Sequence, residues 1–273
     1  DPEPEPAKAE LTPPTVTPPD AAKPETRKKT TPAVSNRTGP WVVAVEPGHG
    51  QEPGAQGHGA NEKDITLSLA KLTVDELNKL PGVEAFLTRK GDYYVSLWKR
   101  TEIAKEKHAD LFVSIHCNAS ENPAAKGTEV FFLSLERASD EAARALAERE
   151  NAVDREMGIE VDAPDIDKIL FDMMQTDVLV KSEYLAETCL DKLFGLGTVY
   201  NRGVKQAGFA VLKSPSIPSI LVEAAFITNQ RENALLRDRD WQRMFSRLLA
   251  DGIGTYIRSV QEAEPTALAD PGE

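Results

Sequence analysis

Cysteine is scarce in this chain. Cys117 and Cys189 are the only two among 273 residues, which is too few for a disulfide framework, and no CxxC pair suggests a thiolate zinc site. A disulfide needs Cα atoms within roughly 7 Å of each other, and nothing in the sequence places these two close together. We therefore expect two free, buried thiols.

Long apolar runs and surplus positive charge are absent too. No run approaches the roughly 18 residues that span a bilayer, so we expect no transmembrane segment. The formal net charge of -12 leaves no basic stripe to neutralise phosphates, which argues against a nucleic-acid partner. The chain begins at Asp1 without an initiator Met or a signal peptide, and we expect a mature or excised fragment.

Large apolar residues are nearly missing from both ends of the chain. Residues 1–40 hold ten of the nineteen prolines, and such a segment cannot bury enough surface to offset its chain entropy. We expect a disordered Pro-rich linker over 1–40 and a disordered tail over 262–273. The hydrophobic content of 40% suits one sizeable domain between them, over 41–261.

Within that domain, strand patterns alternate with helix patterns. The predicted strands are 41–46, 83–89, 109–116, 127–133, 208–213 and 218–226. The predicted helices are 62–80, 97–107 and 241–258. Ser96 can cap the second helix through its hydroxyl. This alternation predicts an α/β fold, with a mainly parallel twisted sheet flanked by helices on both faces.

The alternation breaks after Leu135. Helical patterns dominate from Ser139 to about Leu196, and strand patterns return only afterwards. The simplest account is a helical insertion over 136–206, inside the α/β domain.

Residues that bind metals or move protons stand at the ends of predicted strands. His49 follows the first strand, His116 ends a buried one, and Glu223 follows the apolar run SILV. Glu62 opens the helix after His49, where the helix dipole favours a carboxylate. Ligands of open α/β sheets bind beyond the carboxyl ends of the strands, so we expect these side chains to converge.

Two imidazoles and one carboxylate form a catalytic zinc set with an open fourth position. Zinc there would polarise a carbonyl and acidify water, and Glu223 could take the proton and pass it to a leaving amine. The inferred reaction is metal-assisted amide hydrolysis. The residues alone leave the ligands open: His58 could equally be the second nitrogen ligand, and Glu46, Glu52 and Glu62 cannot be separated. A polar surface group or a helix cap is the plainer interpretation of each residue by itself.

Five segments resemble, in this order, the motifs of zinc-dependent N-acetylmuramoyl-L-alanine amidases. They are VVAVEPGHGQEPGA (42–55), NEKDITLSLAKLT (61–73), LTRKGDYYVSLWKRTEIA (87–104), ADLFVSIHCNAS (109–120) and IPSILVEAAFITN (217–229). By this resemblance His49, Glu62 and His116 correspond to the zinc ligands. Glu223 corresponds to the catalytic glutamate, and His58 becomes a loop residue. The resemblance implies cleavage of the amide between N-acetylmuramic acid and the first L-alanine of the peptidoglycan stem peptide.

The chain departs from the family pattern at three of these motif positions. The family usually has Asp where Glu46 stands, Gly where Gln51 stands and Ala where Cys117 stands. None of these departures removes a ligand.

The insertion is similar to that of the division amidases, whose interrupting helix occludes the active site. In the segment 139–156, helical spacing puts Ala143, Leu146, Glu150 and Val153 on one face. A carboxylate among apolar groups is costly unless it is paired or bound to a cation. By resemblance, Glu150 takes the fourth zinc position in the inhibited state. The alternative is an imperfect amphipathic helix with Glu150 at its rim.

The same resemblance implies a cellular setting. It implies a periplasmic enzyme that splits septal wall during cell separation, and a LytM-type activator protein that draws the blocking helix away. Two other functions stay open at this point. One is a zinc peptidase or carboxypeptidase acting on wall peptides, and the other is a catalytically silent wall-binding module.

Overall fold

The computed structural model describes residues 39–134, 137–158 and 168–262, with the side chains of 168–175 left undescribed. The expected linker over 1–40 and the expected tail over 262–273 lie almost wholly outside these ranges. None of the helices in the described ranges is long and apolar enough to cross a membrane.

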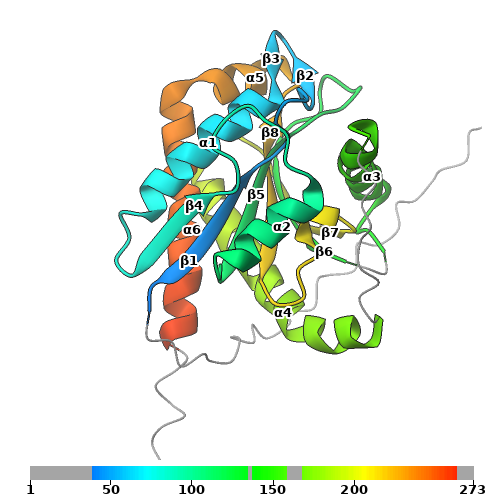
Figure 1. The fold of residues 1–273 in the computed structure, drawn as a ribbon. Coiled ribbons are helices and arrows are strands. Elements are labelled where there is room, and N and C mark those ends of the chain that lie inside the picture. The colour runs from blue at the N-terminus through cyan, green and yellow to red at the C-terminus, as the bar shows by residue number, and fades with distance from the viewer. Residues whose placement is uncertain (1–38, 135–136, 159–167, 263–273) are drawn as a thin grey trace, which may run out of the picture. The chain divides into compact units, whose positions relative to one another are not determined.

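A six-stranded sheet forms the centre of the described domain (Figure 1). Its strands are β1 (Trp41–Pro47), β4 (Val83–Leu87), β5 (Leu111–Asn118), β6 (Thr128–Leu133), β7 (Asn201–Ala207) and β8 (Ser219–Phe226). The spatial order is β4-β1-β5-β8-β6-β7. All neighbouring strands are parallel except β6 and β8, which are antiparallel. The predicted α/β fold with a mainly parallel sheet is confirmed.

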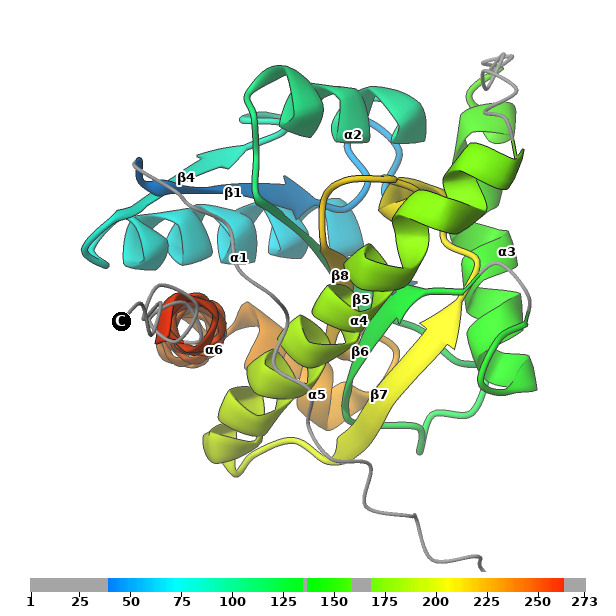
Figure 2. The same ribbon diagram turned by 90° about the horizontal axis from the view of Figure 1, so that it is seen from below.

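Helices cover both faces of this sheet. They are α1 (Glu62–Leu77), α2 (Leu97–Glu106), α3 (Glu141–Glu156), α4 (Lys168–Leu193), α5 (Gln230–Arg237) and α6 (Arg239–Glu262). Figure 2 shows α1 and α2 on opposite sides of β1 and β4. Short 3-10 helices at Phe194–Leu196 and Ala210–Leu212 and a small hairpin of β2 (Gln56–Gly57) and β3 (Ala60–Asn61) complete the described elements.

The core divides into two clusters, one on each face of the sheet. The first joins the sheet to α1, α4 and α6 through side chains such as Leu69, Leu185 and Phe245. The second joins it to α2 and α3 through Ala104 and Leu146. Buried from both sides, β1, β5 and β8 carry the near-continuous apolar runs expected of central parallel strands. The apolar face of α3 is therefore packed on the sheet.

The sequence-based prediction of a strand at 208–213 was wrong. Part of that segment is the 3-10 helix Ala210–Leu212. The strand next to β6 is instead β7, whose residues are mostly polar and half-buried, so no alternation of apolar residues predicted it. Phe209, Val211 and Leu212 are apolar because they fill the second cluster, below α3.

Two predicted helix features had different outcomes. The helix expected over 62–80 ends at Leu77, because the side chain of Asn78 hydrogen-bonds both backbone groups of Ala85 and turns the chain into β4. The predicted cap of α2 is confirmed, since Ser96 Oγ accepts a hydrogen bond from the backbone N–H of Lys99.

Candidate metal centre

Two histidines stand at the same edge of the sheet. β1 and β5 are parallel neighbours, so the loop after β1 and the end of β5 lie together at their carboxyl ends. His49 follows β1, while His116 lies within β5, directly beside Glu223 of β8. The centroids of the two imidazole rings are 4.9 Å apart. This edge is where open α/β sheets bind their ligands.

The glycines around His49 make room for the two rings. A Cβ on Gly48 would lie 2.5 Å from the ring of His116, and a Cβ on Gly54 would lie 2.6 Å from the ring of His49. His49 itself has a φ of 61°, a left-handed conformation that costs a non-glycine residue about 1–3 kcal/mol. The glycine-rich segment is therefore shaped around the imidazoles rather than being a loose surface loop.

The carboxylate of Glu62, the first residue of α1, lies between the two imidazoles. Its Oε2 is 2.9 Å from His49 Nε2, and its Oε1 is 3.0 Å from His116 Nδ1. The backbone N–H groups of Ala55 and Cys117 donate to Oε2 and Oε1 at 2.8 Å each. Burial alone would raise the pKa of Glu62, but the charge of His49 and the hydrogen bond with His116 hold that pKa well below its ordinary value. Glu62 is therefore ionised and fixed in place.

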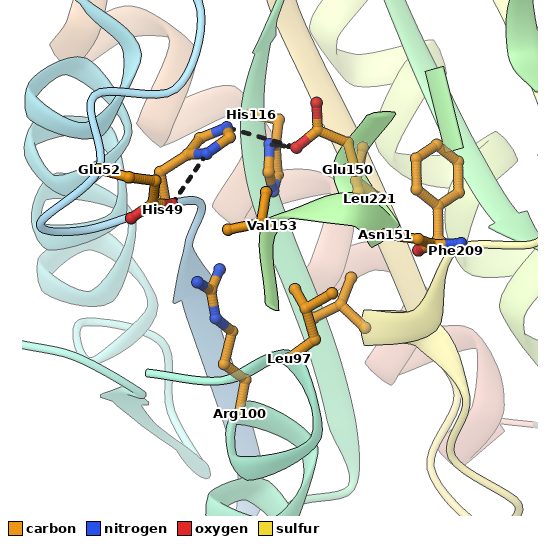
Figure 3. A pocket seen from close by; sticks show the side chains of 11 residues that line it. His49, Glu52, Leu97, Arg100, His116, Glu150, Asn151, Val153, Phe209 and Leu221 are labelled. Atoms are coloured by element: carbon orange, nitrogen blue, oxygen red, sulfur yellow. Dashed lines mark hydrogen bonds and ion pairs between the residues drawn. The ribbon is translucent and has the colours of Figure 1, made fainter. Parts of the chain in front are cut away.

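Glu150 reaches the same point from α3. Figure 3 shows its side chain directed at His49 and His116. Its Oε2 lies 3.4 Å from His49 Nε2 and 3.5 Å from His116 Nδ1, and the residue is only 7% exposed. One candidate ligand atom from each of His49, His116 and Glu150 lies within 4.8 Å of the others. The three residues form a buried His–His–Glu group that can hold a metal ion.

The spacing of the imidazole nitrogens and the carboxylate oxygens suits a metal ion. Ligands about 2.0–2.1 Å from a tetrahedral zinc ion lie roughly 3.3–3.4 Å from one another, and the distances here from the two imidazole nitrogens to the nearest oxygens of Glu62 and Glu150 run from 2.9 to 3.5 Å. His49 Nε2 is buried and makes no hydrogen bond within the described ranges, although Glu62 lies close by. A buried nitrogen that faces carboxylates without a hydrogen bond suits metal ligation.

Glu223 lies in the row of acids beside this group. It pairs in register with His116 on one side and with Glu129 of β6 on the other. Its Oε2 is buried without a hydrogen-bond partner in the described part of the chain. Burial, and then the charges of Glu62, Glu150 and Glu129, raise the pKa of Glu223 well above its ordinary value. Glu223 therefore holds a proton more firmly than an exposed glutamate does.

The other candidates from the sequence are placed apart. Glu46 lies behind His116, 4.0 Å from its Nε2, and is paired with the buried Arg100 at 2.7 Å. Glu52 contacts the far nitrogen of His49, Nδ1, at 3.1 Å. His58 is exposed on the β2–β3 hairpin and contacts the carbonyl of Thr228 instead. Of the three acids left open above, only Glu62 contacts both imidazoles.

The sequence analysis missed the residues that hold Glu150 in place. Asn151 Nδ2 donates to the carbonyl of Gly208 at 2.8 Å, and its Oδ1 accepts from the backbone N–H of Ala210 at 2.7 Å. Asp154 accepts from the backbone N–H of Leu97. The sequence did contain a signal for Asp154, because this residue lies one helical turn after Glu150 and shares its face.

Both cysteines are free and buried, as predicted. Cys117 follows His116 in β5, and its backbone N–H holds Glu62. Burial, with Glu62 and Glu223 nearby, raises the pKa of the Cys117 thiol well above its ordinary value. The thiol is therefore an uncharged packing group.

An α/β domain with a buried His–His–Glu group at its strand ends has the layout of a metal-dependent hydrolase. Comparison with known proteins identifies the family. Residues 43–255 match the family model Amidase_3, described as N-acetylmuramoyl-L-alanine amidase. The chain belongs to this family of peptidoglycan amidases, so the predicted enzyme class is confirmed.

Individual relatives agree with this assignment. The chain is 40% identical to the N-acetylmuramoyl-L-alanine amidase AmiA of Escherichia coli, over 83% of this chain and 79% of that protein. It is 37% identical to AmiC of Neisseria meningitidis over 80% of this chain, which spans about half (53%) of that longer protein. Among solved structures, AmiC2 of Nostoc punctiforme is similar with a TM-score of 0.59 and 30% identity, covering 80% of this chain and 97% of that one.

Proposed function

We propose that this chain is an autoinhibited zinc amidase. It hydrolyses the amide bond between N-acetylmuramic acid and L-alanine in peptidoglycan, and α3 keeps its site closed until an activator binds. Its catalytic domain is 41–261, with a regulatory insertion over 136–206 in which α3 is the blocking element, whereas α4 and β7 belong to the core and the sheet. The observation that carries the proposal is the position of Glu150 Oε2, 3.4 Å from His49 Nε2 and 3.5 Å from His116 Nδ1.

His49, His116 and Glu62 are the residues that would hold the zinc ion. Two imidazoles and a carboxylate are a donor set typical of catalytic zinc. A zinc ion bound there supplies Lewis acidity, which polarises a carbonyl oxygen and acidifies water. The backbone N–H groups of Ala55 and Cys117 hold the Glu62 carboxylate in one orientation, as outer-shell hydrogen bonds do for metal ligands generally.

Glu223 is the acid that moves the proton. Its pKa is raised by burial and nearby carboxylates, which makes its carboxylate a better proton acceptor than an exposed one, and its Oε2 is buried without a hydrogen-bond partner in the described part of the chain. As a carboxylate it can accept a proton from the attacking water, and it can then donate that proton to the leaving amine nitrogen of the stem peptide.

α3 closes the site by occupying it. Glu150 fills the position beside both imidazoles that the substrate carbonyl would need. The cavity left between Glu150, Asn151, the two histidines and their neighbours has a volume of about 10 Å³, which is room for about one water molecule. A glycan strand with its stem peptide does not fit, so substrate has access only when α3 moves.

Polar contacts of two residues that follow Glu150 hold α3 in this position. Asn151 bonds the backbone at Gly208 and Ala210. Asp154 bonds the backbone N–H of Leu97 at the start of α2. The apolar face of α3 packs on the second core cluster as well. The blocked state therefore rests on more than one contact.

The N-terminal end of α3 is tied down separately. Asp140 caps the helix by accepting a hydrogen bond from the backbone N–H of Ala143 at 2.8 Å. Lys205 Nζ of β7 lies 3.0 Å from Asp140 Oδ2 and 2.8 Å from Glu129 Oε2. Because Glu129 faces Glu223 in register, this lysine links the start of the blocking helix to the acids beside the site.

An activator would open the site by preferring the state in which α3 has left. A partner shifts such an equilibrium only through its differential affinity for the two states. The similarity to the division amidases supports a LytM-type protein as this partner. It also supports a periplasmic location and a role in septal wall splitting and cell separation.

The test uses purified peptidoglycan and the zinc-loaded chain. We expect low release of soluble wall fragments by the unaltered chain and higher release by Glu150→Ala. The products should be intact stem peptides with a free L-alanine amine. Release of single amino acids would indicate a carboxypeptidase instead, and zinc-independent binding to the wall without cleavage would indicate a silent binding module.

A further inference from the structure

A carboxylate stands on the side of His49 that faces away from the other ligands. His49 Nε2 faces Glu62 and Glu150, whereas Nδ1 lies 3.1 Å from Glu52 Oε1. Figure 3 shows Glu52 and Glu150 on different sides of this ring. The second oxygen of Glu52, Oε2, is buried and has no hydrogen-bond partner in the described part of the chain. His49 is therefore the side-chain hydrogen-bond partner of Glu52.

We propose that Glu52 is a positioning residue that fixes the orientation and tautomer of His49 for metal binding. This inference rests on the proposed function, because it requires a metal ion at Nε2. A neutral imidazole that offers the Nε2 lone pair carries its proton on Nδ1. An ionised carboxylate can only accept hydrogen bonds, so Glu52 favours the tautomer that binds metal at Nε2 and holds the ring plane.

His49 needs such support more than His116 does. His49 lies in a loop and has a left-handed backbone with a φ of 61°, whereas His116 is held within β5. The carboxylate of Glu46 lies 4.0 Å from His116 Nε2. Both oxygens of Glu46 are already engaged, one by Arg100 and the other by Ser114. Glu52 is the better placed of the two acids to orient a ligand.

The loop that carries Glu52 supplies a matched control. Asp92 Oδ1 accepts from the backbone N–H of Gln51 at 2.8 Å, and Asp92 Oδ2 pairs with Lys63 at 2.8 Å. These contacts hold the same loop without a direct bond to His49. Asp92→Ala therefore removes a carboxylate and loosens the loop while leaving the Glu52–His49 hydrogen bond in place.

The experiment measures the zinc affinity of the folded chain by competition with a chromophoric chelator. We expect Glu52→Ala to weaken zinc binding about 10–100-fold, as loss of an outer-shell partner does elsewhere. Glu52→Gln should show a smaller loss, because its amide oxygen still accepts from Nδ1–H. Asp92→Ala should stay within about twofold of the unaltered chain, since it breaks no hydrogen bond to a ligand. Cobalt substitution adds a spectroscopic readout, and the visible spectrum should change in Glu52→Ala but not in Asp92→Ala.

Two results would overturn the role of Glu52. One is unaltered zinc affinity in both Glu52 variants, and the other is an equal loss in Asp92→Ala, which would assign the effect to the loop. Failure of the unaltered chain to bind zinc would instead overturn the proposed function, and the role of Glu52 with it.

Discussion

Asp154 of α3 accepts a hydrogen bond from the backbone N–H of Leu97, the first residue of α2, at 3.0 Å. The hydroxyl of Tyr94 donates to the same carboxylate oxygen. A carboxylate at a helix N-terminus also interacts favourably with the helix dipole. The helix α3 is thus bound to the body of the domain by a contact that does not involve the candidate metal ligands.

Asp154→Ala should raise the activity of the chain in the absence of any activator. Hydrogen bonds to a charged group contribute about 1.5–3 kcal/mol, and each 1.4 kcal/mol changes an equilibrium about tenfold. We therefore expect fragment release from peptidoglycan to rise about 10–100-fold. The control is Arg144→Ala, which alters exposed ion pairs on the solvent face of the same helix and should change nothing. An Asp154→Ala variant that folds normally and releases no more than the unaltered chain would refute this prediction.

Glu150→Ala alone should activate less than the double variant Glu150→Ala with Asp154→Ala. Removing Glu150 frees the position beside the imidazoles, but Asn151 and Asp154 still hold α3 over it. Initial rates of the two single variants and the double variant, measured on one wall preparation, separate the effects. Full activity in the Glu150 single variant would mean that the metal contact alone keeps the helix in place.

Glu223→Gln should abolish turnover while zinc stays bound. Loss of a general acid–base group typically lowers the rate about 10²–10⁴-fold. Glu223 makes none of the contacts described above for the candidate metal ligands, so zinc binding should not depend on it. Rate and zinc content, measured on the same sample in the open Asp154→Ala background, test this. Equal losses of zinc and activity would make Glu223 a structural residue.

Glu223→Gln should also stabilise the metal-free fold, with a defined pH dependence. The pKa of Glu223 is raised above its ordinary value of 4.5 by burial and by nearby carboxylates. A carboxyl whose folded pKa is raised loses stability as the pH rises above the unfolded pKa, because ionisation is then favoured only in the unfolded chain. Urea midpoints of the two proteins should therefore coincide near pH 4 and diverge, in favour of the variant, towards pH 7.5. A difference that is largest in acid would contradict the assignment.

Removal of the metal should lower both activity and thermal stability. A ligand at about 100 times its Kd stabilises a fold by about 2.7 kcal/mol, which corresponds to about 5–10 °C in Tm for a domain of this size. Chelation followed by addition of zinc, monitored by thermal unfolding, checks this. The variant His49→Ala with His116→Ala should show no zinc-dependent shift, and a shift of the same size there would locate the ion elsewhere.

Parallel topology made much of the site predictable. His49 and His116 follow or end apolar strand patterns, and parallel neighbours bring such ends to one edge. The acid at 150 stood out because it interrupts an apolar helical face. These inferences depend on local periodicity and on one general property of sheets, both of which the sequence contains.

The sequence alone did not predict side-chain contacts between residues far apart in the chain. Nothing local says that Asp154 meets Leu97, which is 57 residues away, or that Asn151 bonds the backbone at 208–210. The apolar segment 208–213 was taken for a strand because burial under a helix and burial in a sheet leave the same pattern in a short run. The residues alone did not separate Glu46, Glu52 and Glu62; the family resemblance selected Glu62, and in the structure Glu62 is the one of the three that contacts both imidazoles.

The most direct measurement is an anomalous-scattering map of the zinc-loaded, unaltered chain, collected at the zinc edge. The account predicts one peak surrounded by His49 Nε2, His116 Nδ1, a Glu62 oxygen and Glu150 Oε2. A peak coordinated without Glu150 while α3 stays packed on the sheet, or no peak between the two imidazoles, would contradict it.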